Sequence, residues 1–173
     1  DFAALTGFFG VENDGCDFRA EAIEQGAQNT RFILRWQGKG YPVTLPTVGV
    51  HNVYDAAAAF GAGVTLGVEP EEAAAALSDY LPSGMRQRVV PCEGLTVIED
   101  CYNASPDSVK ASLKALAAMP CKGRRAAVLG DMLELGAVSE QAHLSCGRLA
   151  AESADLLFAY GPLAKGYAQG ARE

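Results

Sequence analysis

Over the first 48 residues, four short runs rich in apolar residues are separated by polar residues and glycines, and such runs are typical of β-strands. Gly38 and Gly40 separate the last two runs, which favours a hairpin turn between them. Two helices are expected next, an alanine-rich one from His51 to about Ala62 and one from Pro70 to Tyr80 that begins among acidic residues. The predicted strands are Ala4–Phe9, Asp17–Glu24, Thr30–Trp36 and Tyr41–Leu45.

A break at Leu81-Pro82-Ser83-Gly84 predicts a boundary between two domains, residues 1–82 and residues 83–173. Downstream of it, strand-like and helix-like runs alternate. Such alternation is typical of right-handed crossovers and of a parallel sheet covered on its faces. The sequence therefore predicts an α/β protein with a Rossmann-like second domain. The predicted strands there are Arg88–Pro91, Leu95–Glu99, Ala126–Leu129 and Leu156–Ala159, and the helices are Pro106–Ala118, Ser139–Glu152 and one from Pro162.

The stretch from Ile98 to Ser108 carries the strongest chemical signal. The apolar run ends in Glu99 and Asp100, a short polar loop follows, and Ser105-Pro106-Asp107 has the residue types of a helix N-cap and first turn. Ligands bind to open α/β sheets at such places, because strand ends and free helix N–H groups converge there. The run from Arg125 to Gly130 repeats the arrangement and ends in Asp131. Both segments indicate part of a nucleotide-using enzyme.

Four motifs in order along the chain resemble the Mur ligases. Glu99 to Ser108 is similar to a strand end followed by Tyr-Asn-Ala-x-Pro-Asp-Ser, and Val128 to Gly136 is similar to Val-Leu-Gly-Asp-Met-Leu-Glu-Leu-Gly. His51-Asn52-Val53-Tyr54 and Gly84-Met85-Arg86 supply the other two matches. The resemblance implies that residues 1–82 are the end of a central ATP-binding domain. Residues 83–173 would be a C-terminal ligase domain that lacks its last strand–helix units.

The resemblance is strongest to the members of this family that join D-Ala-D-Ala to UDP-MurNAc-tripeptide in peptidoglycan synthesis. It implies use of ATP and Mg2+, an acyl-phosphate intermediate and a cytoplasmic location. However, the sequence contains no Gly-x-x-x-x-Gly-Lys-[Ser/Thr] run, and its only Gly-Lys pair is Gly38-Lys39. Without a phosphate-binding loop, phosphoryl transfer lacks its electrostatic clamp. We therefore expect the chain to be inactive alone and the magnesium ligands to lie outside it.

The resemblance also implies contacts to ATP. Asn52 would lie against the adenine, whose edge an amide can satisfy as both donor and acceptor; the alternative is that Asn52 only caps a helix. Asp55 stands where the family usually has Asn, so we do not assign it to the adenine. Asp100 would accept hydrogen bonds from the ribose, with its neighbour Glu99 as the alternative.

Arg86 is the expected catalytic residue. In the family, the arginine at this position reaches the γ-phosphate and the acyl-phosphate, for which a planar guanidinium offers two parallel donors. The alternatives are that Arg86 is a solvated linker residue or that Arg88 takes this part.

Residues in the Glu99–Ser108 and Val128–Gly136 motifs are expected to border the site of the incoming dipeptide. Tyr102, Asn103, Asp107 and Asp131 are the substrate-binding candidates, although Tyr102 could simply pack and Asp131 could cap a turn. His143 is expected to be a structural hydrogen-bonding residue and not a general base.

The composition of the chain argues against several other classes of protein. A net charge of −7 argues against binding to nucleic acid or to an anionic membrane surface, and no apolar run approaches the roughly 20 residues of a membrane span. Five cysteines without a Cys-x-x-Cys pair argue for reduced thiols and no metal site. Two alternatives remain, a Mur ligase that adds another amino acid and a non-catalytic Rossmann-type nucleotide-binding module. A module of the second kind would need a Gly-x-Gly-x-x-Gly run after a strand, and this sequence has no such run after any predicted strand.

Overall fold

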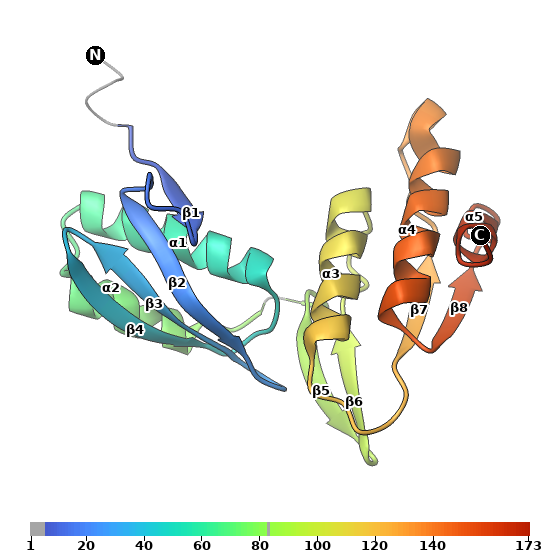
Figure 1. Cartoon of the computed structure of the whole chain (residues 1–173), viewed down its shortest axis with the longest axis horizontal. Helices are drawn as coiled ribbons and strands as arrows, with labels where there is room; N and C mark the ends of the chain where they lie inside the picture. Colours follow the sequence, from blue (N-terminus) through green and yellow to red (C-terminus); the bar gives the residue numbers. More distant parts are fainter. Residues whose placement is uncertain (1–5, 83) are drawn as a thin grey trace. The chain divides into compact units, whose positions relative to one another are not determined.

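The computed structural model describes residues 6–82 and 84–173 and divides the chain into two compact units, residues 1–82 and residues 83–173 (Figure 1). Both units mix helices with strands, which confirms the predicted α/β class. The predicted strand 4–9 falls partly on residues 1–5, outside the described residues, and β1 begins at Phe9. None of the described helices is long and apolar enough to cross a membrane.

Unit 1 is a four-stranded sheet in the order β1–β2–β3–β4. Strands β1 (Phe9–Val11) and β2 (Phe18–Gln25) are parallel, while β3 (Thr30–Trp36) and β4 (Lys39–Leu45) continue the sheet in antiparallel fashion. The β3–β4 hairpin is confirmed, and its two turn residues, Gln37 and Gly38, have φ values of 47° and 77°. Positive φ at both positions is the mark of the turn type whose twist matches a two-residue hairpin.

Two helices follow the sheet of unit 1. Helix α1 (Val50–Thr65) packs on β1 and β2, and α2 (Pro70–Ala76) packs on β4. The second helix was expected to reach Tyr80, but it ends at Ala76 and gives way to a 3-10 turn, Leu77–Asp79.

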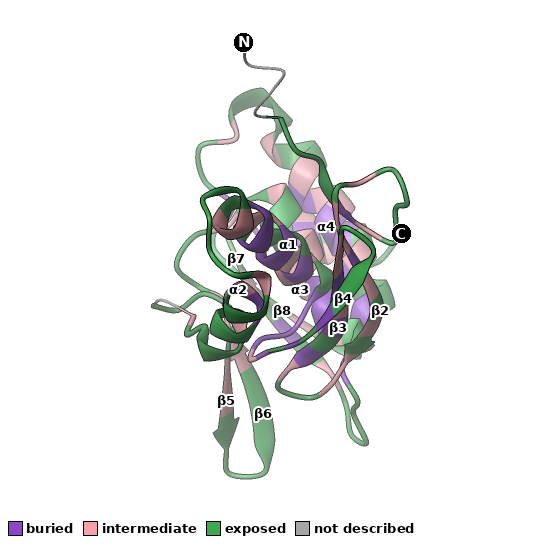
Figure 2. Cartoon of the chain, turned by 90° about the vertical axis from the view of Figure 1, so that its left-hand side faces the viewer, coloured by how far each residue is buried: buried purple, intermediate pink, exposed green. Residues whose placement is uncertain are grey.

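The core of unit 1 follows the alternation of the sequence. In β4, Tyr41, Val43 and Leu45 are buried, whereas the residues between them are exposed. They meet one side of α1, where buried residues recur at helical spacing (Figure 2). The α1 residues that complete this core are Val53, Ala56, Ala57, Phe60 and Gly61.

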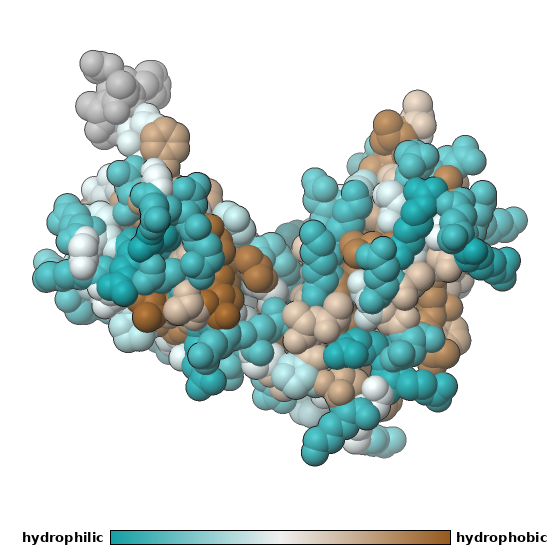
Figure 3. Space-filling model, viewed as in Figure 1, coloured by the Kyte–Doolittle hydropathy of each residue, from teal (hydrophilic) through white to brown (hydrophobic). Residues whose placement is uncertain are grey.

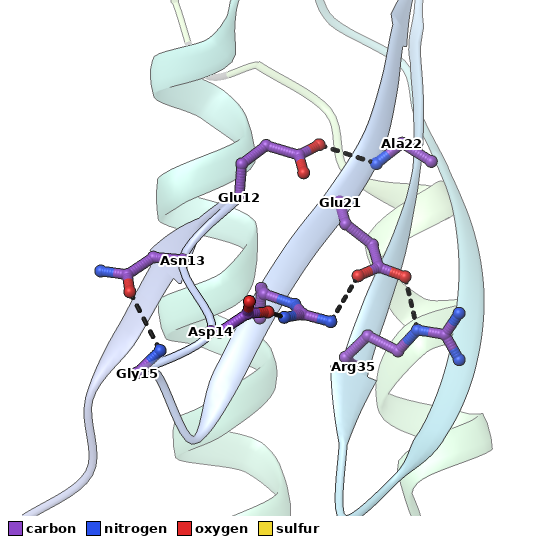
Figure 4. Close-up of polar contacts among 8 residues, drawn as sticks. Glu12, Asn13, Asp14, Gly15, Glu21, Ala22 and Arg35 are labelled. Carbon is purple, nitrogen blue, oxygen red and sulfur yellow. Dashed lines mark hydrogen bonds and ion pairs between the residues drawn. The ribbon is translucent and has the colours of Figure 1, made fainter.

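A polar cluster holds the β1–β2 connection onto the sheet (Figure 4). Ala22 has a φ of 52° within a register shift between Glu21 and Glu24, and its N–H donates to Oε1 of Glu12 at 2.9 Å. The Glu21 carboxylate lies 2.5 Å from Nε of Arg35 and 2.6 Å from the Arg19 guanidinium. The hydrogen bond from Arg35 is the main reason that the pKa of Glu21 lies below its usual value.

Unit 2 contains a hairpin and a parallel strand pair. Strands β5 (Arg88–Cys92) and β6 (Leu95–Glu99) form a two-stranded antiparallel sheet closed by Glu93 and Gly94, with φ values of 43° and 83°. Helix α3 (Pro106–Ala118) leads to β7 (Ala126–Gly130), and α4 (Ser139–Ser153) connects β7 to β8 (Leu156–Tyr160), which pairs with it in parallel.

The parallel pairing expected after residue 83 is present between β7 and β8, whereas β5 and β6 pair in antiparallel fashion. A two-residue turn reverses the chain, so β6 must run antiparallel to β5. In the part of unit 2 that the structure describes, parallel pairing occurs only between β7 and β8. The last helix, α5 (Lys165–Gly170), starts three residues after the predicted Pro162.

The core of unit 2 lies between the helices α3, α4 and α5. Val109 and Leu113 of α3 face Cys146 and Ala150 of α4, with Tyr167 of α5 fully buried beside them. Two glycines allow α4 and α5 to approach closely. A Cβ on Gly147 would overlap the carbonyl oxygen of Tyr167, and one on Gly170 would overlap that of Leu144. The opposite face of the strand pair is open, and Figure 3 shows apolar surface where β8 lies.

Candidate functional site

The segment just before β5 extends the hairpin and carries Arg86. The carbonyl oxygen of Met85 accepts hydrogen bonds from the N–H groups of Cys101 and Tyr102 at 3.0 and 3.3 Å. This pairing places the Arg86 guanidinium over the Tyr102 ring, with Cζ 4.3 Å from the ring centroid. A cation over an aromatic face is attracted by the ring quadrupole. Two predicted site residues that lie 16 positions apart in the sequence are therefore in contact.

Asp100 follows β6 and its carboxylate is held by three donors. Its Oδ1 accepts from the backbone N–H of Gln87 at 3.3 Å, and its Oδ2 accepts from Nε2 of Gln87 at 3.4 Å and from Oγ of Ser112. The neighbouring Glu99 instead lies 3.8 Å from Arg88, its cross-strand partner. The hairpin register thus turns Asp100 toward α3 and Glu99 toward Arg88.

Sequence reasoning missed Gln87 and Ser112. Neither belongs to a motif, and Ser112 reaches the site only because α3 packs beside the hairpin end. Counting residues back from the Glu93-Gly94 turn would have placed Gln87 opposite Asp100, so the signal for Gln87 was present in the sequence.

The N-terminus of α3 forms as its sequence predicts. Ser105 is the N-cap, its Oγ accepts from the N–H of Ser108 at 3.2 Å, and the Ser105 N–H donates to Oγ of Ser108 at 3.0 Å. Pro106 is at the first helical position and Asp107 lies exposed in the first turn. Asn103 uses its Oδ1 to accept the N–H of Ala104 at 2.9 Å. Together with Tyr102, which is 63% exposed, these residues lie in the loop and first turn at the N-terminus of α3.

Asp131 lies at the end of β7 and is tied to the loop before α5. Its Oδ1 accepts the N–H of Ala164 at 2.7 Å, and its carboxyl group fills the space where Gly161, with a φ of 117°, has no Cβ. One oxygen of Asp131 therefore fixes the β8–α5 loop. The other oxygen forms no hydrogen bond with any residue that the structure describes.

His143 acts as a structural hydrogen-bonding residue. It is 1% exposed, and its Nε2 accepts the N–H of Met132 at 3.1 Å. Because Nε2 is an acceptor, Nδ1 carries the proton, which it donates to the carbonyl oxygen of Ser139 at 2.7 Å. The imidazole thereby holds the loop that follows Asp131 against α4.

Asn52 lies in unit 1, in the first turn of α1. The helix begins at Val50 with Gly49 as its N-cap, so the interpretation of Asn52 as the cap is wrong. Its Nδ2 donates to the carbonyl oxygen of Val48 at 2.7 Å and lies 3.1 Å from Nε2 of His51. Asp55 is exposed one turn later.

Metal and thiol chemistry have little support here. Within residues 6–82 and 84–173 there is no group of three or more His, Cys, Asp or Glu side chains that could hold a metal ion. All five cysteines are free. Cys101 is exposed beside Met85, and burial raises the pKa of the Cys146 thiol, which keeps it in its unreactive protonated form.

Comparison with known proteins links these residues to one family. The family model described as "Mur ligase, glutamate ligase domain" matches residues 85–172. The UDP-N-acetylmuramoyl-tripeptide--D-alanyl-D-alanine ligase of Bacillus subtilis is 38% identical over 157 residues, covering 90% of this chain and 34% of that protein. The ligase of the same name from Treponema pallidum is 35% identical over 152 residues, covering 87% of this chain and 32% of that protein.

Solved structures of MurF are also similar to this chain. MurF from Acinetobacter baumannii has a TM-score of 0.86 at 32% identity and covers 96% of this chain and 36% of that one. MurF from Thermotoga maritima, solved in complex with ADP, has a TM-score of 0.81 at 26% identity and covers 94% of this chain and 37% of that one. The chain thus spans about a third of the length of the relatives that it matches.

Proposed function

Because this chain belongs to the Mur ligase family, we propose that it forms part of an ATP-dependent ligase that joins D-Ala-D-Ala to UDP-MurNAc-tripeptide in peptidoglycan synthesis. Residues 1–82 form the end of the ATP-binding domain and residues 83–173 belong to the C-terminal domain. The observation that carries the proposal is the contact of Arg86 with Tyr102 beside Asp100, because one hairpin end then presents a phosphate-binding and a ribose-binding group together. The names of the relatives at 35–38% identity, and the ADP in one related structure, support it.

The reaction has two steps. The tripeptide carboxylate attacks the γ-phosphorus of ATP, which gives an acyl-phosphate and ADP. The amine of D-Ala-D-Ala then attacks the acyl carbon, and the bond to the phosphate oxygen breaks to give an amide and inorganic phosphate.

Arg86 serves the charged groups of these steps. Its guanidinium offers a planar pair of donors to the phosphate oxygens, and the Tyr102 ring below it restricts the directions that the donors can take. Asp100 accepts from the ribose, and Asn52 in unit 1 contacts the adenine. Electrostatic stabilisation by a preorganised donor accelerates phosphoryl transfer because the donor need not reorganise as charge moves.

The incoming dipeptide takes its place near the N-terminus of α3. Tyr102, Asn103 and Asp107 border it, and they are all exposed at that end of the helix. Asp131 keeps one carboxylate oxygen for the dipeptide amine while the other holds the Ala164 N–H. The positive end of the helix dipole favours the dipeptide carboxylate.

Magnesium would neutralise the phosphates during transfer. The described residues of this chain do not supply a cluster of ligands for it, and we assign no residue here to the ion. The 173-residue sequence also has no Gly-Lys-[Ser/Thr] phosphate loop. The chain by itself should therefore bind nucleotide weakly and show no turnover.

The test is a coupled assay of ADP release with the 173-residue chain and with a complete ligase that contains it. The complete enzyme should release ADP in the presence of UDP-MurNAc-tripeptide and D-Ala-D-Ala, and the chain alone should not. Replacing the dipeptide by L-alanine, glutamate, lysine or diaminopimelate tests the other Mur-type activities. D-Ala-D-Ala-dependent turnover by the chain alone, or a preference for a single amino acid, would contradict the proposal.

Arg86→Lys tests the assigned catalytic residue in the complete ligase. Lysine keeps the charge but loses the planar pair of donors, so kcat should fall more than the KM for ATP rises. Arg124→Lys makes the same change at an exposed position outside the site and is the matched control. A wild-type kcat for Arg86→Lys would leave Arg86 as a linker residue.

A further inference from the structure

The two carboxylate oxygens of Asp100 are used unequally. Oδ2 accepts from Nε2 of Gln87 at 3.4 Å and from the Ser112 hydroxyl, whereas Oδ1, among the described residues, accepts only the backbone N–H of Gln87 at 3.3 Å. A carboxylate offers about four lone-pair positions, two on each oxygen. Both positions of Oδ2 are therefore filled within the chain, and Oδ1 keeps one position for another donor.

Gln87 and Ser112 also bind each other. Nε2 of Gln87 donates a hydrogen bond to Oγ of Ser112 at 3.0 Å, and the Ser112 hydroxyl in turn donates a hydrogen bond to Asp100. Gln87 is only 8% exposed and its backbone has a φ of 49°. The three residues come from the segment before β5, the segment after β6 and the middle of α3. The carboxylate of Asp100 cannot rotate without breaking bonds to two other segments.

We propose that Gln87 and Ser112 are positioning residues that fix Asp100 so that it reads a ribose through Oδ1 alone and contacts a single hydroxyl. This inference rests on the proposed function, in which Asp100 is the ribose contact. A free carboxylate can accept from both hydroxyls of a ribose, one on each oxygen. With Oδ2 saturated by Gln87 and Ser112, the two hydroxyls of the nucleotide become unequal for this protein.

The unequal hydroxyls can be measured with nucleotide analogues. In the complete ligase, kcat/KM is compared for ATP, 2′-deoxy-ATP and 3′-deoxy-ATP. Loss of a hydrogen bond to a charged group lowers affinity roughly tenfold or more. One analogue should therefore be impaired roughly tenfold, while the other stays within about twofold of ATP. Equal impairment by both analogues would overturn the single-hydroxyl reading.

Two variants test the positioning role. Gln87→Met keeps the length of the side chain and removes its amide, and Ser112→Ala removes the hydroxyl. Each should raise the KM for ATP roughly 3- to 10-fold with kcat within about twofold, because ribose contacts are made in both ground and transition states. The difference between the two analogues should shrink in both variants. Thr96→Val, at an exposed position of β6, is the control and should keep wild-type discrimination.

Asp100→Ala separates this inference from the function on which it rests. If Asp100→Ala leaves the KM for ATP unchanged, Asp100 is not the ribose contact and that assignment of the proposed function fails. If Asp100→Ala abolishes discrimination between the analogues but Gln87→Met and Ser112→Ala retain it, the positioning role alone is overturned. Thermal unfolding followed by circular dichroism confirms that each variant is folded.

Discussion

Replacing His143 by alanine should destabilise unit 2 and leave unit 1 intact. The imidazole is 1% exposed, and it joins the loop after β7 to the first turn of α4 through Met132 and Ser139. Its ring also packs on Tyr167 of α5, with 4.8 Å between ring centroids. One side chain therefore connects the loop after β7, the first turn of α4 and helix α5.

The expected cost follows from two losses. The N–H of Met132, in a residue that is 0% exposed, would lose its acceptor, and an unpaired buried donor costs about 1–3 kcal/mol. Removing a buried ring also leaves a cavity, for which large-to-small substitutions of aromatic residues cost about 3–5 kcal/mol. Because the neighbouring side chains relax in part, we expect a total of about 3–5 kcal/mol and not the sum of both terms.

Urea unfolding of the 173-residue chain provides the assay. Trp36 is the only tryptophan and lies in β3, so its fluorescence reports on unit 1, while far-UV circular dichroism reports on both units. In His143→Ala, the unfolding transition of unit 2 seen by circular dichroism should move to a lower urea concentration. The midpoint of the transition seen by Trp36 fluorescence should not change. Gln141→Ala, at an exposed position of the same helix, should change stability by no more than about 0.5 kcal/mol.

Two results would refute this reasoning. One is a destabilisation of unit 2 by less than about 1 kcal/mol, which would mean that the buried hydrogen bonds contribute little. The other is a nitrogen NMR spectrum in which Nε2 of His143 carries the proton, since that tautomer cannot accept from Met132.

Three further predictions concern the chain alone. Gly147→Ala should destabilise it by about 1–3 kcal/mol in urea, since a Cβ would overlap the backbone of α5, while Gly123→Ala, with open space around it, should not. Iodoacetamide labelling followed by mass spectrometry should modify the three exposed cysteines quickly and Cys146 only after unfolding, and fast labelling of Cys146 would contradict its burial. Because the pKa of Glu21 is lower in the folded chain than its ordinary value of 4.5, the ionised carboxylate stabilises the fold at pH values above 4.5. This contribution is lost as the pH falls below 4.5 and the carboxylate becomes protonated. Glu21→Gln should therefore lose stability less steeply than wild type in acid titrations, and parallel curves would count against the role of Arg35.

The elements and their chemistry could largely be predicted from the sequence. A short run rich in apolar residues predicted β3 at its observed bounds, and the Ser-Pro-Asp start predicted α3 from Pro106 to Ala118. Both signals are local, because side-chain period and helix capping depend on neighbours within a few positions. The motifs that contain Arg86, Asp100 and Tyr102 could be recognised for the same reason, since the residues that identify each motif are close neighbours in the sequence.

Only the tertiary structure decided which of these local pieces meet. The sequence predicted one parallel sheet, whereas the Glu93-Gly94 turn closes β5 and β6 into their own antiparallel pair. That pairing sets Arg86 on Tyr102 and Gln87 on Asp100. Hydrogen bonds between distant residues depend on strand register and helix packing, which are fixed by the whole core and not by any short window. The types of the site residues are therefore written in the sequence, and their partners are determined by the fold.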